Sequence, residues 1–185
     1  MKQIAILGST GSIGTSTLSI VASYPERFHV ASLVAGHNVE LAFQQCAQWR
    51  PLVASMATPE LAQQLAVRLR SSGITGIEVV SGTEGSVRAA TLKEVDFVVS
   101  AIVGVAGLEA TYAAVMAGKP VGLANKECMV AAGEILTRAA REKHVPLLPI
   151  DSEHNAIHQC MRAGTRQEVK QIWLTSCRVP ARMHW

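Results

Sequence analysis

Apolar residues fall into short runs of strand length that alternate with longer amphipathic segments of helix length. Runs such as Ile4–Leu7 and Phe97–Ile102 are almost wholly apolar, which is typical of strands buried on both faces of a parallel sheet. Pro59–Arg70 has the features of a helix, with Thr58 as its cap. The other predicted strands are Phe28–Val34, Leu52–Met56, Ile77–Val80, Pro120–Ala124, Val145–Ile150 and Val169–Thr175, and the other predicted helices are Ser12–Ser23, Val39–Trp49, Leu108–Met116 and Glu127–Lys143.

This alternation predicts an α/β fold with a doubly wound, mostly parallel, Rossmann-like sheet and helices on both faces. Ligands are then expected at the carboxyl ends of the strands. The composition changes after Ile150, where a polar stretch, Asp151–Asn155, precedes a short helix. We therefore expect a nucleotide-binding domain over residues 1–150 and the incomplete start of a second domain over residues 151–185.

Composition narrows the function without fixing it. Hydrophobic residues make up 49% of the 185 residues and charged residues 17%, so a packed core is expected. The net charge of +3 is scattered, which argues against a nucleic-acid partner, and an anionic small ligand accounts for it. The four cysteines show no CxxC spacing, and neither a secretion signal nor a transmembrane segment is evident, so we expect a cytoplasmic protein with no membrane partner.

A glycine-rich loop directly follows the first predicted strand. Gly8, Gly11 and Gly14 form G-x-x-G-x-x-G, ending inside the first predicted helix. Glycines permit a tight turn, and the main-chain N–H groups at a helix N-terminus attract a pyrophosphate. The strand before the loop and the helix after it therefore predict a site for a nicotinamide dinucleotide.

The end of the second predicted strand bears on which dinucleotide binds. Proteins that bind NAD usually carry an acid there for the ribose 2′-hydroxyl. Here the chain reads Gly36-His37-Asn38, and no acid appears until Glu40. An imidazole and an amide tolerate a 2′-phosphate, which favours NADP, although the same residues are also suited to a simple polar turn.

Two carboxylates, Asp151 and Glu153, follow the predicted strand Val145–Ile150. Oxygen ligands at this spacing suit Mg²⁺ or Mn²⁺, with a third ligand supplied from elsewhere. The same residues also suit the start of a helix, with Asp151 or Ser152 as the cap. His154 and His158 are spaced for zinc, but the sequence shows no further ligand beyond Glu153, so we interpret His158 as a structural residue.

Four motifs in this order resemble 1-deoxy-D-xylulose 5-phosphate reductoisomerases: residues 2–15, 101–108, 123–127 and 148–157. The resemblance covers about residues 1–175. It implies conversion of 1-deoxy-D-xylulose 5-phosphate, a sugar phosphate, to 2-C-methyl-D-erythritol 4-phosphate in non-mevalonate isoprenoid biosynthesis. It also implies NADPH and a divalent metal (Mn²⁺, Mg²⁺ or Co²⁺) as cofactors.

The resemblance also implies roles for individual residues. Lys126 and Glu153 would be catalytic, and Lys126, Ser152 and Glu153 would bind the substrate. Asp151 and Glu153 would bind the metal, which makes residues 151–185 the start of an α+β catalytic, metal-binding domain. The implied cofactor-binding residues are Thr10, Gly11, Ser12, Ile13, Gly36, His37, Asn38, Asn125 and Glu127.

The chain departs from the family pattern after Thr175. A glycine-rich run ending in Gly-Gly-Pro-Phe-Arg is expected, but the sequence reads SCRVPARMHW to Trp185. This is typical of a frameshifted or prematurely ended reading frame. We expect the chain to lack the third metal carboxylate and the substrate phosphate pocket, to bind NADPH weakly and to turn over little. Members of the family are typically homodimers, and we expect this chain to form that dimer weakly or not at all.

Two other functions stay open. A semialdehyde dehydrogenase starts with a similar glycine loop and needs an activated cysteine, for which Cys128 is the best placed. A small buried cysteine packed as a hydrophobe is the plainer interpretation of Cys128. The second alternative is a non-catalytic NADP-binding module, which would need no metal.

Overall fold

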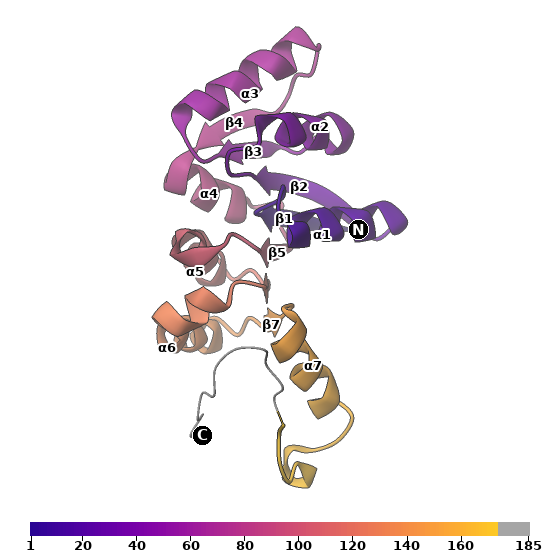
Figure 1. Cartoon of the computed structure of the whole chain (residues 1–185), viewed down its shortest axis with the longest axis vertical. Coiled ribbons are helices and arrows are strands. Elements are labelled where there is room, and N and C mark those ends of the chain that lie inside the picture. The colour runs from indigo at the N-terminus through magenta and orange to yellow at the C-terminus, as the bar shows by residue number, and fades with distance from the viewer. Residues whose placement is uncertain (174–185) are drawn as a thin grey trace.

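The computed structural model describes residues 1–173, which form one parallel sheet covered by helices (Figure 1). The sheet has seven strands in the order β4-β3-β2-β1-β5-β6-β7. The strands are β1 (Lys2–Leu7), β2 (Phe28–Val34), β3 (Val53–Met56), β4 (Glu78–Ser81), β5 (Phe97–Ser100), β6 (Val121–Leu123) and β7 (Leu147–Pro149). The α-helices are α1 (Ser12–Ser23), α2 (Val39–Trp49), α3 (Pro59–Ser71), α4 (Gly82–Ala90), α5 (Leu108–Met116), α6 (Lys126–Glu142) and α7 (Ser152–Met161), and two 3₁₀ turns are η1 (Gly104–Gly107) and η2 (Arg166–Glu168).

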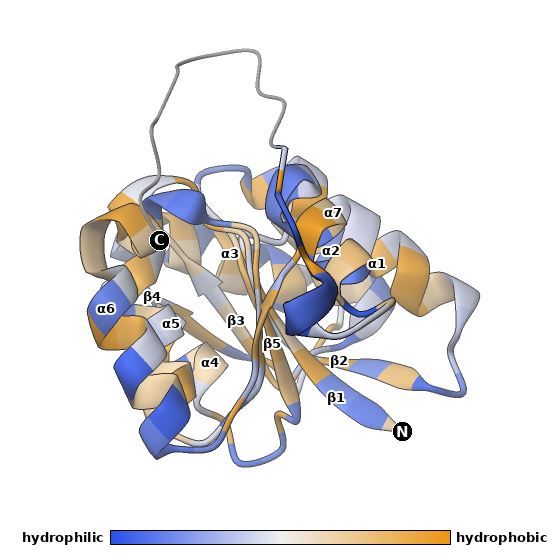
Figure 2. Cartoon of the chain, turned by 90° about the horizontal axis from the view of Figure 1, so that it is seen from below, coloured by the Kyte–Doolittle hydropathy of each residue, from blue (hydrophilic) through white to orange (hydrophobic). Residues whose placement is uncertain are grey.

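Helices cover both faces of the sheet, which confirms the predicted doubly wound fold. Apolar residues of α1, α2 and α3 form a core on one face, and those of α4, α5 and α6 form a second core on the other. Figure 2 shows α4, α5 and α6 together on one side of the strands and α1, α2 and α7 on the opposite side. The strands between these layers are apolar because both of their faces are covered.

The order of the strands reverses at β1. This central strand pairs with β2 on one side and with β5 on the other, so Ile4 lies opposite Val30 and Phe97. Ala5, Ile6 and Leu7 are wholly buried. A reversal of this kind opens a crevice at the carboxyl ends of the strands, which is where α/β proteins of this class bind ligands.

Most predicted elements are confirmed to within three residues, but one helix was missed and one predicted strand was wrong over the described residues. Helix α4 was not predicted, because its buried residues are small and two glycines weaken the helical pattern. The predicted strand Val169–Thr175 is not formed over Val169–Trp173. The chain runs away from the sheet along α7 to η2 (Figure 1), and Val169–Trp173 add no strand to the free edge of β7. Leu174, Thr175 and the segment Ser176–Trp185 lie outside the described residues.

Helix α6 differs from its prediction in one respect. Ala132 has non-helical dihedral angles (φ −147°, ψ 27°), which divide the helix into a short first part and a longer second part. In residues 1–173 no helix is both long and apolar enough to cross a lipid bilayer.

Candidate functional site

The residues predicted to bind ligands follow four strands, β2, β1, β6 and β7, and one motif of the family resemblance follows β5, which lies between β1 and β6 in the sheet. Because all the strands are parallel, these five loops meet at one edge of the sheet. Residues 8–14, 36–38, 101–107, 125–127 and 151–153 are therefore brought together although they span most of the chain. This convergence makes the carboxyl edge the candidate site.

The first and last glycines of the glycine loop, Gly8 and Gly14, are packed too closely for a side chain to fit. Gly8 has a φ of +88°, and a Cβ atom there would lie 2.6 Å from the carbonyl oxygen of Ala101. A Cβ atom on Gly14 would overlap the carbonyl oxygen of Gly8. The N–H groups of Gly8 and Ser9 both donate to the Val34 carbonyl, at 2.8 Å each, which fixes the turn against β2.

Helix α1 begins in a way that suits an anion. Its N-cap is Gly11, no side chain caps it, and its first turn, which includes Ser12 and Ile13, carries no acidic residue. The N–H groups of a first helical turn have no partner within the helix, so an uncapped start leaves donors for a ligand. The loop and helix therefore fit a pyrophosphate group, and Thr10 lies in the same turn.

The turn after β2 offers no free carboxylate. Gly36, His37 and Asn38 are exposed, and a Cβ atom on Gly36 would meet nothing within 4 Å. Asn38 caps α2 by accepting a hydrogen bond from the Leu41 N–H at 3.0 Å, which leaves its NH₂ group as a donor. The first acid, Glu40, pairs with Arg68 and accepts a hydrogen bond from Gln44.

Sequence reasoning missed one residue of this region, Gln45. Its side chain is 5% exposed, and its Nε2 donates to the carbonyl oxygen of Ser9 at 2.9 Å. Helix α2 is thereby tied to the glycine loop. The sequence feature that could have revealed it is that a polar residue, Gln45, lies on the same face of α2 as the buried residues Ala42 and Cys46.

Asn125 is buried at the end of β6, at 3% exposure. Its Nδ2 donates to the carbonyl oxygens of Ile102 and Gly104, the latter at 2.5 Å, and its Oδ1 accepts from the Cys128 N–H at 3.1 Å. The amide is therefore fully used within the protein. Lys126 and Glu127, the next two residues, are exposed at the edge.

The acidic motif shows the helix-capping geometry and keeps an exposed carboxylate. Asp151 caps α7 by accepting from the His154 N–H at 2.9 Å, and its second oxygen lies 2.9 Å from the His154 ring nitrogen Nδ1. Ser152 Oγ donates to Glu153 Oε2 at 2.6 Å. This hydrogen bond, and more weakly the charge of Lys126, lower the pKa of Glu153, which favours its ionised form.

Two of the described residues have the chemistry of metal ligands. Asp151 and Glu153 offer hard oxygen ligands of the type that Mg²⁺ prefers. No group of three His, Cys, Asp or Glu side chains suited to a metal occurs within residues 1–173. The pair therefore fits one side of a coordination shell whose other positions need substrate oxygens, water or another carboxylate.

Cys128 lacks the environment of a reactive nucleophile. Its side chain is fully buried, and burial followed by the neighbouring Glu127 charge raises the pKa of the thiol. A raised pKa reduces the thiolate that attacks a carbonyl. The plainer interpretation, a small packed hydrophobe, agrees with this position.

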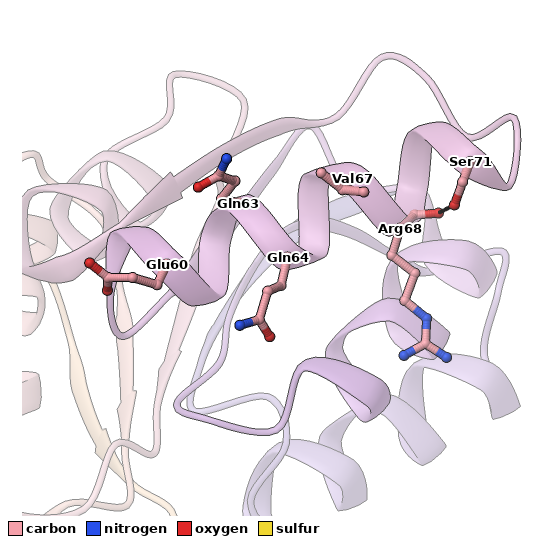
Figure 3. A pocket seen from close by; sticks show the side chains of 6 residues that line it. All are labelled: Glu60, Gln63, Gln64, Val67, Arg68 and Ser71. Atoms are coloured by element: carbon pink, nitrogen blue, oxygen red, sulfur yellow. Dashed lines mark hydrogen bonds between the residues drawn. The ribbon is translucent and has the colours of Figure 1, made fainter.

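A surface hollow lies away from these loops, along α3 (Figure 3). All of its lining residues come from that one helix, and none is a predicted site residue. They are Glu60, Gln63, Gln64, Val67, Arg68 and Ser71. We therefore do not assign it to the candidate site.

Comparison with known sequences identifies two family models in the chain. One, described as 1-deoxy-D-xylulose 5-phosphate reductoisomerase, matches residues 4–133. The other, described as the C-terminal domain of the same enzyme, matches residues 147–184 and so continues past Thr175. A reductoisomerase from Solibacter usitatus is 49% identical over 98% of this chain and 47% of its own length. One from Geobacter metallireducens is 50% identical over 95% of this chain and 45% of its own length.

Comparison with solved structures identifies the same family. A crystal structure of DOX-P reductoisomerase in complex with NADPH, fosmidomycin and magnesium is 41% identical, with a TM-score of 0.83 over 86% of this chain and 39% of that one. The Zymomonas mobilis enzyme in complex with NADPH is also 41% identical, with a TM-score of 0.80 over 86% of this chain and 41% of that one. This chain therefore spans about half the length of the relatives it matches.

Proposed function

This chain belongs to the 1-deoxy-D-xylulose 5-phosphate reductoisomerase family, and from that premise we propose that it binds NADPH for the reaction of that family. In that reaction 1-deoxy-D-xylulose 5-phosphate is rearranged and then reduced to 2-C-methyl-D-erythritol 4-phosphate. The observation that carries the proposal is the meeting of the glycine loop, Lys126 and the carboxylates of Asp151 and Glu153 at one edge of the sheet.

We propose that the cofactor lies across the reversal point between β1 and β5. Thr10, Gly11, Ser12 and Ile13 would hold the pyrophosphate through the uncapped start of α1. Gly36, His37 and Asn38 would surround the adenosine ribose, and Asn125 and Glu127 would lie by the nicotinamide half. The amide of Asn125 is engaged within the protein, so its main chain would make any direct contact.

The chemistry divides between the bound groups and the chain. When bound, the divalent metal supplies a Lewis acid for the carbon–carbon rearrangement, and NADPH supplies the hydride. Lys126, exposed at the start of α6, would stabilise negative charge that develops on a substrate oxygen. Asp151 and Glu153 would hold the metal, and Ser152 and Glu153 would contact the substrate.

Residues 1–150 would form the NADPH-binding domain, and residues 151–185 would begin the catalytic domain. We propose the cytoplasm as the compartment, since Cys46, Cys128 and Cys160 form no disulfide within residues 1–173. We also propose that this chain by itself forms at most a weak homodimer, which light scattering coupled to size exclusion would measure.

Calorimetric titration with NADPH and NADH tests the cofactor proposal. We expect NADPH to bind at least about tenfold more tightly, because the 2′-phosphate meets donors and no free carboxylate. The matched variant His37→Asp places an acid at the ribose and should shift the preference toward NADH. Tighter binding of NADH by the unmodified chain, or binding of neither cofactor, would refute the proposal.

Titration with fosmidomycin in the presence of NADPH tests the metal proposal. We expect Mg²⁺ to tighten binding and the double variant Asp151→Asn, Glu153→Gln to abolish this dependence. Binding that is unchanged by Mg²⁺ in the unmodified chain would instead favour an NADP-binding module without a metal.

A further inference from the structure

We infer that the Asn125 side chain is a positioning residue, which shapes the nicotinamide half of the cofactor cleft without touching the ligand through its amide group. The inference rests on the proposed function, because it concerns how the same cleft is held.

Every hydrogen-bonding group of the Asn125 side chain has a protein partner. The two amide hydrogens are donated to Ile102 and Gly104, in the loop that follows β5. The amide oxygen accepts from the Cys128 N–H, in the first turn of α6. One side chain therefore joins the loop after β5 to the helix that begins after β6.

The loop is packed directly onto this amide. A Cβ atom on Gly107 would lie 3.0 Å from Cβ of Ile102 and 3.4 Å from Nδ2 of Asn125. The segment between these contact points leaves Val103 85% exposed and Val105 64% exposed. The loop thus exposes apolar side chains at the carboxyl edge. Its main chain is held in place by the hydrogen bonds from Asn125 to the carbonyl oxygens of Ile102 and Gly104.

The first turn of α6 depends on the same contacts. Ala132 has non-helical dihedral angles, so a kink separates residues 126–131 from the longer part of the helix, which buries Leu136, Ala139 and Ala140. Of the side chains in this short part, only Cys128 is buried. Asn125 and Cys128 therefore set the position of Lys126 and Glu127.

These contacts lie on one half of the cleft only. In a doubly wound sheet a dinucleotide crosses the reversal point, with one nucleotide on each half. The ribose turn 36–38 lies on the β2 side, so the adenosine belongs there. The segments joined by Asn125 follow β5 and β6, on the other side of β1, where the nicotinamide belongs.

The variant Asn125→Asp separates the two roles of the amide. An aspartate keeps the oxygen that caps α6, but it replaces both donors with a carboxylate facing two carbonyl oxygens. In the full 185-residue chain we expect the affinity for NADPH to fall at least tenfold. The affinity for 2′-phospho-ADP-ribose, which lacks the nicotinamide ring, should change less than twofold.

Calorimetry with both ligands, at a temperature where circular dichroism shows the chain folded, makes the comparison. Asn125→Ser is the second variant: it stays neutral, can still cap the helix, and should show the same split if the aspartate variant does not fold. Thr58→Ala, which removes the cap of α3, is the control, and should lower the melting temperature without changing either affinity.

The outcomes are distinct. Selective loss of NADPH affinity in either Asn125 variant supports the inference. Equal weakening of both ligands, or no weakening of either, overturns it while leaving the proposed function in place. Failure of the unmodified chain to bind either ligand overturns the proposed function, and the inference with it.

Discussion

Two glycines determine how closely the first loop approaches the rest of the sheet. Gly8 packs against the main chain of Ala101, and Gly14 packs against the main chain of Gly8. The two halves of the cleft therefore meet across main-chain atoms, with no side chain between them. Few other residue types could occupy either position without moving the loop.

Substitution of Gly14 by alanine tests this packing. The added methyl group meets main-chain atoms, which cannot move aside as a flexible side chain could, so we expect a loss of about 1–3 kcal/mol of unfolding free energy. Urea unfolding provides the measurement. Gly36→Ala, where the methyl group meets nothing within 4 Å, should have an effect below about 0.5 kcal/mol. Equal effects of the two substitutions would contradict the packing argument.

The buried thiols give a prediction about reactivity. Burial raises the pKa of Cys46 to about 12 and, together with Glu127, raises the pKa of Cys128, so both are protonated at pH 8. Among the cysteines of residues 1–173, we expect exposed Cys160 to react with iodoacetamide first at pH 8, and both buried thiols to react only after unfolding. Peptide mass spectrometry measures the order. Rapid labelling of Cys128 in the folded chain would revive the semialdehyde dehydrogenase alternative.

The place of a residue in the fold was easier to predict than the hydrogen bonds that its side chain makes. The family resemblance implied that Asn125 contacts the cofactor, and it gave no sign that the side-chain amide hydrogen-bonds to Ile102, Gly104 and Cys128. Those partners are distant in sequence or depend on the local path of a loop. Gln45 was missed for the same reason, because its partner Ser9 lies 36 residues away.

At the level of single elements, helix α3 shows which sequence features were sufficient to predict where a helix begins. Thr58 caps it by accepting from the Leu61 N–H at 3.4 Å, and Pro59 follows, as predicted. Helix α4 lacks such signals, since its contact with the sheet is made by Ala89, Ala90 and other small residues. Small residues allow close packing, but they do not mark a hydrophobic face in a sequence.

The buried face of α3 can be tested by a cavity. Leu65 is fully buried in the core on that face of the sheet, so Leu65→Ala should lower the unfolding free energy by about 2–5 kcal/mol. Val67 on the same helix is 50% exposed, and Val67→Ala should change it by less than about 0.5 kcal/mol. Urea unfolding of both variants makes the comparison. A small effect at Leu65 would show that the core adjusts to fill the cavity.

At the scale of the whole molecule, the nucleotide-binding unit is predicted to be stable without the residues after Ile150. Neither α7 nor η2 buries a residue, whereas Leu147 and Ile150 pack onto the two cores. A chain of residues 1–150 should therefore melt within about 3 °C of the 185-residue chain. A chain of residues 1–143, which lacks β7, should be markedly less stable. A large loss already at residue 150 would refute the proposed domain boundary.

The strand order also has a consequence for the order in which the protein is synthesised. β1 is made first and can pair with β2 early, but Phe97, which lies opposite Ile4, is added 93 residues later. At about 5–20 residues per second, β5 arrives roughly 5–20 s after β1. During that interval the central strand of the sheet, whose residues Ala5, Ile6 and Leu7 are wholly buried in the folded protein, keeps one edge open on the ribosome. The centre of the sheet is therefore the part of the nascent chain that depends most on being shielded until β5 arrives.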